Sequence, residues 1–350
     1  MRTEMKRRAF LQSLGILWAG WTVEGWAKPL RTDRYSASLV QVSETRNLMG
    51  TFVTITLFHS SPERGQAVLG EAFQRMENQI GIFNRHDNRS PLSYLNERGV
   101  LSNPPPELVK LLQRSLTIHL RTGGVFDPTV KPVLDLYETE KERGRLPQPA
   151  AIRATLDRVG AGGLKTGFQE IVFSKEGMGV TLDGIAKGAI VDDAIVFLQK
   201  KGIRRALVDA GGDLRVMGGR SDDLPWRIAV YHPDQVAQDQ EIITLMEGAV
   251  ATSGNYMVFF DREKVHHHIL QPKNGDSPPW SVSATVLAPS AEEADALATS
   301  LMLLNSEEGL ALINRDQRLA ARLISREGRS RYSLRWTKNF RTREGGKEDV

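Results

Sequence analysis

The sequence predicts an α+β fold with mixed, largely antiparallel sheets and packed helices. Helical and strand patterns alternate irregularly, without the regular βαβ repeat of a parallel sheet. Several strand segments follow one another over short turns, as in hairpins, mostly in the C-terminal third. The chain has 350 residues and 40% hydrophobic content, so it can bury an ordinary core in one large domain or two closely joined ones.

The N-terminal half is expected to supply one strand and three helices. Residues 51–58 alternate and are rich in β-branched side chains, which predicts a strand. Ser61-Pro62 begins a helix whose apolar residues recur at helical spacing as far as Phe83. Prolines begin a second helix over 104–124 and two glycines end it, and a third helix is expected over 146–160.

The rest of the chain is expected to be mostly strands. Helices are predicted over 186–202 and from about Ala291 to Asn305, and a hairpin over 318–336 closes the fold. The expected strands lie at 170–174, 179–183, 204–218, 226–232, 241–254, 256–260, 265–272 and 280–288. This irregular mixture supports the α+β class.

Composition excludes several classes of protein and site. The net charge is +4 and the pI is about 9.2, which is compatible with an anionic ligand. The basic residues are spread along the chain without a run of four, so we expect no nucleic-acid partner. The absence of cysteine excludes disulfides, thiolate metal sites, a cysteine nucleophile and a lipid anchor on cysteine.

The N-terminal stretch "MKRRAFLQSLGILWAGWTVEGWAKPL" predicts a twin-arginine export signal. Arg7 and Arg8 precede a moderately apolar stretch, and cleavage is expected after Ala27. The alternative is a membrane anchor, which needs about 20 mostly apolar residues, whereas polar side chains interrupt this stretch. We therefore expect a signal peptide at 1–27, one domain over 28–340 and a disordered tail over 341–350. The mature protein is expected in the periplasm.

A candidate cation site lies in "APSAEEADALATSLMLL". Ser290 and Glu293 form a capping box, which places Asp295 and Thr299 one turn apart on one helix face. Two oxygen ligands at this spacing suit Mg²⁺, which takes few protein ligands and completes its shell with phosphate and water. The alternative is an aspartate at the solvent edge beside an ordinary helical threonine.

A candidate anion site lies in "TLDGIAKG". A strand that turns at Gly184 into a helix exposes backbone N–H groups and the positive helix end. Lys187 could pair there with a phosphate or a carboxylate, although the spacing is not that of a Walker A loop. The alternative is a tight strand–helix packing joint with a surface lysine.

Three further motifs carry polar or flexible residues. Asp127, between a glycine turn and Pro128, could accept hydrogen bonds from a heterocycle or could merely organise the turn. Gly211-Gly212 within a strand predicts a bulge or the close approach of a ligand. The histidines at 266–268 would alternate faces on a strand, so a zinc site is not expected, and one histidine acting as a general base is favoured.

Eight motifs occur in a fixed order from about Met49 to Leu304. They are "MGTFVTITL", "FNRHDNRSPLSYLN", "TGGVFDPTVKPVLDLY", "LDGIAKGAIVD", "VDAGGDL", "ATSGNY", "HHILQPKNG" and "SVSATVLAPSAEEADALATSL". Any one is a weak signal, but eight in order are highly specific. Together they resemble the ApbE family, the FAD:protein FMN transferases. The resemblance implies an ApbE-like, T-fold-like architecture.

The resemblance also implies a reaction. FAD binds with Mg²⁺, and a threonine or serine hydroxyl of a partner protein attacks the phosphorus on the FMN side of the pyrophosphate. AMP leaves, and FMN stays attached through a phosphoester. Such a transfer needs positioning and charge neutralisation more than covalent catalysis.

The matching motifs imply a role for each site residue. The Mg²⁺ ligands are Asp295, Thr299 and the backbone carbonyl of Gly184, and His268 is the base for the acceptor hydroxyl. The positions that contact FAD are Met49, His86, Val125, Phe126, Asp127, Thr181, Lys187 and Leu270.

The chain departs from the family pattern at several positions. The family often has Asp where this chain has Thr181, and Asp183 falls where Gly or Ser is common. A shift of two positions keeps a carboxylate on the same strand face, so Asp183 is a further candidate FAD contact. Ala298 replaces a carboxylate that some members carry before the metal-binding threonine, which predicts a wetter, weaker Mg²⁺ site. Gln271 replaces the usual Asp before Pro272.

Two alternatives remain beside transfer. Water could replace the acceptor hydroxyl, which would make the protein an FAD pyrophosphatase giving FMN and AMP, or the chain could be a non-catalytic periplasmic FAD-binding protein. The family suggests an acceptor flavoprotein subunit of a membrane redox complex, flavinylated in a motif resembling Ser/Thr-Gly-Ala-Thr/Ser. Because the cysteine of lipoprotein relatives is missing, membrane contact is expected only through the partner or an uncleaved signal.

Overall fold

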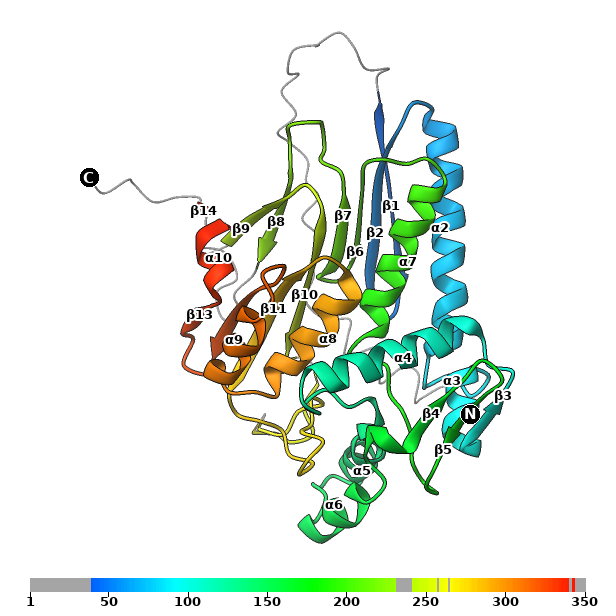
Figure 1. Cartoon of the computed structure of the whole chain (residues 1–350), viewed down its shortest axis with the longest axis vertical. Coiled ribbons are helices and arrows are strands. Elements are labelled where there is room, and N and C mark those ends of the chain that lie inside the picture. Colours follow the sequence, from blue (N-terminus) through cyan, green and yellow to red (C-terminus); the bar gives the residue numbers. More distant parts are fainter. Residues whose placement is uncertain (1–38, 231–240, 257, 264, 340–341, 344–350) are drawn as a thin grey trace, which may run out of the picture.

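The computed structural model describes residues 39–230, 241–256, 258–263, 265–339 and 342–343 (Figure 1). The predicted signal peptide at 1–27 and most of the predicted tail at 341–350 lie outside the described residues. The two described tail residues, Thr342 and Arg343, form strand β14. No helix in the described ranges is long and apolar enough to cross a membrane.

A large antiparallel sheet forms the centre of the molecule. Among the described residues it has eight strands, and every neighbouring pair is antiparallel. In spatial order they are β1 (Val40–Leu48), β2 (Thr51–His59), β6 (Ala206–Ala210), β7 (Asp213–Met217), β10 (Gly248–Gly254), β11 (Ser281–Ala288), β12 (Ala320–Ser325) and β13 (Ser330–Tyr332). The predicted α+β class is confirmed.

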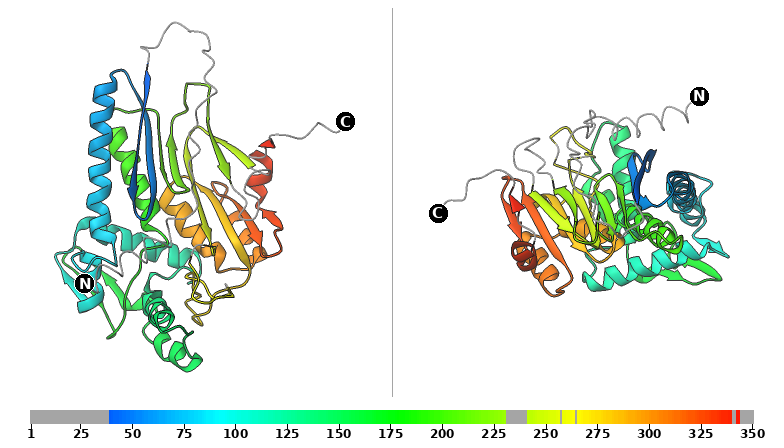
Figure 2. Two further views of the ribbon diagram at one scale, coloured as in Figure 1. Left: turned by 180° about the vertical axis from the view of Figure 1, so that it is seen from behind. Right: turned by 90° about the horizontal axis from the view of Figure 1, so that it is seen from above.

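Alternation along the strands gives this sheet two apolar faces. On β6, Ala206 and Val208 belong to the core shared with the helices, whereas Leu207 packs into the cluster on the opposite face. The helices α2 (Pro62–Phe83), α7 (Ala186–Lys200), α8 (Ala291–Met302) and α9 (Ser306–Asn314) cover the first face (Figure 2). The opposite face packs against β8 (Trp226–Val230), β9 (Glu241–Leu245) and α10 (Leu334–Asn339).

Smaller elements gather at one end of the sheet, at the bottom of Figure 1. They are α3 (Pro91–Arg98), α4 (Pro106–Arg121), the 3-10 helices η1 (Pro128–Val130) and η2 (Ala161–Gly163), α5 (Lys131–Glu142), α6 (Pro149–Leu156) and the three-stranded sheet of β3 (Val100–Ser102), β5 (Glu170–Phe173) and β4 (Leu164–Thr166). The irregular segment after β10 reaches the same end, because Phe260 and Leu270 share a buried cluster with Tyr137 of α5. This end therefore brings together the motifs that the sequence singled out.

Several predicted strands are wrong. Residues 241–254 form two strands in different sheets, β9 and β10, and not one strand. Residues 179–183 form no strand, because the Val180 N–H and carbonyl bond to the side-chain amide of Asn96 and the Thr181 N–H bonds to the Pro128 carbonyl. The described residues of 256–260 and 265–272 contribute only one isolated bridge, between Phe259 and His267. The double glycine is neither a bulge nor part of a strand. Gly211 and Gly212 both have positive φ and make the two-residue turn of the β6–β7 hairpin.

Candidate active site

The helices α7 and α8 cross closely at Gly188. A Cβ built on Gly188 would lie 2.2 Å from the carbonyl oxygen of Ala291 and 2.7 Å from the nitrogen of Glu292. The Gly188 N–H donates to Oδ2 of Asp295 over 3.0 Å, and the side chain of Asp295 is 5% exposed. The glycine is therefore required by the α7–α8 contact, which also fixes the candidate metal ligand Asp295.

Gly188→Ala tests this contact. The added methyl group would push α7 away from α8, and overpacking of this kind costs roughly 1–3 kcal/mol of unfolding free energy. We expect a loss near the upper end of that range, measured by urea unfolding. Gly70→Ala is the matched control, because nothing lies within 4 Å of its built Cβ in helix α2. The control should be neutral or slightly stabilising, and an equal loss in both variants would contradict the packing argument.

The second and third predicted metal ligands lie next to each other. A Cβ built on Gly184 would lie 3.0 Å from Oγ1 of Thr299 and 3.4 Å from the Phe126 ring. Oγ1 of Thr299 is also 3.2 Å from Oγ of Ser253, which belongs to β10. The turn before α7, the face of α8 and the end of β10 therefore meet around Thr299.

Lys187 lies beside this group and forms an ion pair. Its ammonium is 3.0 Å from Oδ2 of Asp213, whose side chain is 2% exposed. Burial alone would lower the pKa of Lys187, but Asp213 and Asp295 raise it above its ordinary value. Lys187 is therefore charged. Its ion pair with Asp213 rules out the alternative interpretation, a surface lysine at a simple strand–helix packing joint.

Two of the carboxyl groups around Lys187 resist ionisation. Burial and Asp213 raise the pKa of Asp295 well above its ordinary value, against the opposing effects of Lys187 and the Gly188 amide. Burial also raises the pKa of Asp209, which precedes the β6–β7 turn. Three carboxyl groups thus share one nearby ammonium, an environment that a divalent cation would relieve.

The residues fit a hard cation that takes few protein ligands. Within the described ranges, no cluster of three or more His, Asp or Glu side chains is placed to hold a metal. Asp295, Thr299 and the Gly184 backbone would instead offer one carboxylate, one hydroxyl and one carbonyl. Mg²⁺ accepts such a sparse set because water and substrate phosphate complete its shell.

A buried arginine organises the neighbouring turn. The Arg85 side chain is 6% exposed, and its guanidinium lies 2.7 Å from both Asp183 and Glu138. Burial alone would lower the pKa of Arg85, but these two carboxylates raise it. Burial and Arg85 lower the pKa of His86. Asp183, predicted as an FAD contact, is therefore held by Arg85, and its half-exposed side chain lies directly before Gly184.

The three consecutive histidines have three different environments. His266 pairs with Asp261 at 3.0 Å, and His267 is fully buried with its Nε2 at 3.2 Å from the Pro278 carbonyl. Nδ1 of His268 is 3.4 Å from the carbonyl oxygen of Val258. Burial lowers the pKa of His268, and the charges of Asp183, Arg85 and Glu138 also act on it. Of the three histidines, only His268 has both a lowered pKa and an electrostatic interaction with Asp183.

Asp127 has the turn-organising role that was one of its two interpretations. Its Oδ1 accepts from the N–H and hydroxyl of Thr129, at 2.8 and 2.6 Å. Its Oδ2 accepts from the Ala161 N–H at 3.1 Å. Thr181 is tied to the same segment through its N–H and the Pro128 carbonyl. These contacts join η1, η2 and the turn before α7 into one unit.

The remaining predicted FAD contacts lie at different depths. Met49 is partly buried in the β1–β2 turn with φ 53°, and the β6–β7 turn lies alongside, because a Cβ on Gly211 would touch Thr51. Phe126 is buried in the main core, and Val125 packs beside the cluster under α8. The Leu270 side chain is buried with Tyr137 and Phe260, so only its backbone is available to a ligand.

Sequence reasoning missed Asp192, Asp213 and Arg85 as organising residues. Asp192 caps α8 from α7 by accepting the N–H groups of Ala291 and Glu292, each at 2.9 Å. All three act on partners distant in the sequence. The one signal available was the pair of aspartates that follows Lys187 in the first turns of α7.

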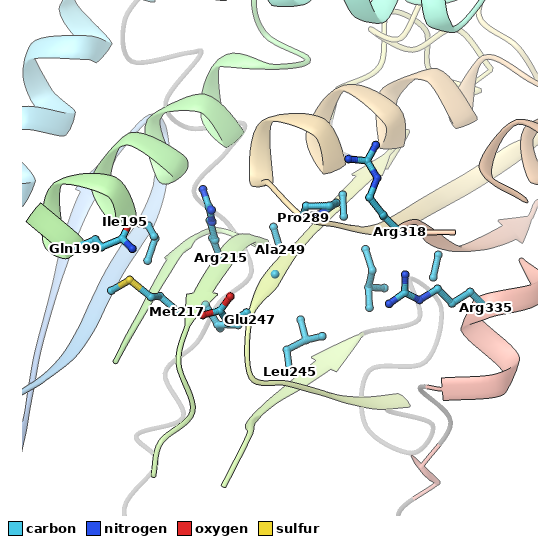
Figure 3. A pocket seen from close by; sticks show the side chains of 15 residues that line it. Ile195, Gln199, Arg215, Met217, Leu245, Glu247, Ala249, Pro289, Arg318 and Arg335 are labelled. Carbon is cyan, nitrogen blue, oxygen red and sulfur yellow. The ribbon is translucent and has the colours of Figure 1, made fainter. Parts of the chain in front are cut away.

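One described cavity lies away from the candidate site residues. It is a groove of about 390 Å³ lined by residues of α7, β7, β9, β10, β11 and β12 and by Arg318 and Arg335 (Figure 3). Its Arg215 is already paired with Asp192 at 2.7 Å. None of the predicted site residues lines it, so volume alone does not mark the candidate active site.

Comparison with known proteins connects this group to one family. The sequence model of the ApbE family matches residues 49–323. The chain is 27% identical over 318 residues to the FAD:protein FMN transferase of Treponema pallidum, covering 85% of this chain and 88% of the relative. It is 30% identical over 255 residues to that of Vibrio cholerae, covering 69% and 71%.

Solved structures of ApbE proteins resemble this chain in fold. The flavin transferase ApbE from Vibrio cholerae aligns with a TM-score of 0.75 at 27% identity, covering 87% of this chain and 100% of that one. The ApbE protein of Thermotoga maritima aligns with a TM-score of 0.77 at 26% identity, covering 87% and 100%. The family match spans strands β2 to β11 together with α7 and α8, which are the elements that carry the candidate site. The chain therefore belongs to the ApbE family.

Proposed function

We propose that this chain is an Mg²⁺-dependent FAD:protein FMN transferase. A threonine or serine oxygen of the acceptor attacks the phosphorus on the FMN side of FAD and forms a new P–O bond. The bridging P–O bond breaks, AMP leaves, and the hydroxyl proton passes to His268. Mg²⁺ would offset the charge of the pyrophosphate, the largest electrostatic requirement of the reaction.

One observation carries the proposal. Gly184 comes from a different motif than Asp295 and Thr299 of α8, yet all three meet at the α7–α8 crossing with Lys187 alongside. This arrangement combines an oxygen ligand set with an ammonium suited to phosphate. Because a simple FAD carrier needs no base, the neutral His268 near the Asp183 turn favours a reactive site over a storage site.

We also propose where the protein acts and on what. The Arg7-Arg8 segment supports export by the twin-arginine pathway to the periplasm. The acceptor would be a flavoprotein subunit of a membrane redox complex. Contact with the membrane would then run through that partner, or through an uncleaved signal.

Product analysis tests the reaction. The protein is incubated with FAD and Mg²⁺, with and without a domain carrying a Ser/Thr-Gly-Ala-Thr/Ser motif, and nucleotides are separated by chromatography. AMP release that requires the acceptor is the expected result. AMP and free FMN without acceptor would identify a pyrophosphatase, and bound FAD without either product would identify a carrier.

A further inference from the structure

Lys187 forms an ion pair with one buried carboxylate, Asp213, and interacts electrostatically with a second, Asp295. Its ammonium is 3.0 Å from Oδ2 of Asp213, and it also acts electrostatically on Asp295. Asp213 is fixed from its other oxygen, because Oδ1 accepts the Thr252 N–H at 3.2 Å. The lysine therefore has a rigid partner on β7 and a second, competing carboxylate on α8.

Among the residues that the structure describes, one hydrogen bond is seen to the Asp295 carboxylate. Its Oδ2 accepts the Gly188 N–H, and this hydrogen bond leaves Oδ1 for another partner. The residue before Gly188 is Lys187, so the ammonium that could claim this oxygen starts from the same turn of α7. A lysine side chain has a flexible four-carbon stem and follows the strongest nearby negative charge.

We propose that Asp213 is a positioning residue that keeps Lys187 off Asp295. Resting on the proposed function, this assigns Asp213 to the preparation of the Mg²⁺ site. With Lys187 held by Asp213, Asp295 stays open to a divalent cation. Without the charge of Asp213, Lys187 would pair with Asp295 and compete directly with the metal, because its partly buried ammonium is stabilised by a nearby counter-charge.

Asp213→Asn is the variant that tests this role. Asparagine keeps the shape and can still accept the Thr252 N–H, but it cannot hold the ammonium as an ion pair. The readout is the affinity for Mn²⁺, a paramagnetic substitute for Mg²⁺, from the resonance signal of free Mn²⁺ at saturating FAD without acceptor. We expect affinity to fall at least about tenfold, a change of about 1.4 kcal/mol.

The double variant Asp213→Asn/Lys187→Met separates competition from structural damage. Removing the competing ammonium should restore most of the Mn²⁺ affinity lost in Asp213→Asn. Asp209→Asn is the matched control, since it removes a nearby carboxylate from the same hairpin whose Oδ1 accepts the Gly212 N–H at 2.9 Å. It should lower the affinity much less, because no ion pair with Lys187 is lost.

Each result of these Mn²⁺ measurements either supports or refutes the positioning role of Asp213. Unchanged Mn²⁺ affinity in Asp213→Asn, an equal loss in Asp209→Asn, or no recovery in the double variant would overturn the positioning role. Absence of Mn²⁺ binding by the wild-type protein would instead refute the metal site itself, and this inference with it. If Asp213→Asn does not fold, Asp213→Ser takes its place as a second uncharged variant, and unchanged Mn²⁺ affinity there would overturn the positioning role.

Discussion

His268→Ala is expected to lower the rate of FMN transfer by at least about a hundredfold, in the range that general-base catalysis supplies. FAD affinity should change less than about twofold. The reason is geometric: Nδ1 of His268 faces the Val258 carbonyl at 3.4 Å, so the ring presents Nε2 as the proton acceptor. Rates come from single-turnover mass spectrometry, and affinities from flavin fluorescence.

Two controls sharpen this prediction. His268→Asn offers an amide to the Val258 carbonyl but no base, so it should be as inactive as His268→Ala. His266→Ala removes a neighbouring histidine that pairs with Asp261, and it should keep most of the activity. Transfer that survives in His268→Asn would show that His268 holds the loop and takes no proton.

The pH profile of the wild-type protein follows from the same residue. Burial lowers the pKa of His268 below its ordinary 6.5, so the ring is neutral and competent at pH 7. Its proton is gained only as the pH falls through the lowered pKa, and the transfer rate should fall there. The residual rate of His268→Asn should lack this acid limb.

Asp295→Asn is expected to abolish Mg²⁺-dependent transfer, with a loss of at least about a thousandfold. The amide still accepts the Gly188 N–H, but it removes the one carboxylate among the proposed ligands. Added Mg²⁺ should recover little activity. Activity that reaches wild-type levels at high Mg²⁺ would contradict the assignment of Asp295 as a metal ligand.

Asp295→Asn should leave the stability of the metal-free protein unchanged or raise it, although it abolishes activity. Burial and Asp213 raise the pKa of Asp295 above its unfolded value, so ionisation of this carboxyl costs folding free energy as the pH rises. Metal-free Asp295→Asn should therefore unfold at the same or a higher urea concentration than the wild-type protein at pH 7. A marked loss of stability would show that the carboxylate serves the fold rather than a ligand.

Local patterns predicted the helix that carries the metal ligands. The capping residues placed its start near Ala291, and the Ser290 hydroxyl does accept the Glu293 N–H at 3.3 Å. Only half of the capping box forms, because the Glu293 carboxylate pairs with Arg121 instead. Spacing alone put Asp295 and Thr299 on one face, and the structure agrees.

Long-range partners could not be read from local patterns. Residues 179–183 have the composition of a strand, but the side chain of Asn96 binds Val180 and prevents pairing with another strand. Asp127 looked like a ligand because its partner Ala161 lies far along the chain. The sequence did not single out Asp213 either, because its role depends on an ion pair with Lys187, which lies on a different element.

The most direct test of the central claim is the intact mass of an acceptor domain after incubation with this protein, FAD and Mg²⁺. The proposed transfer predicts a gain equal to FMN minus water on one threonine or serine, AMP in solution, and no gain when EDTA removes the metal. An unchanged acceptor mass, with FAD consumed or merely bound, would contradict it.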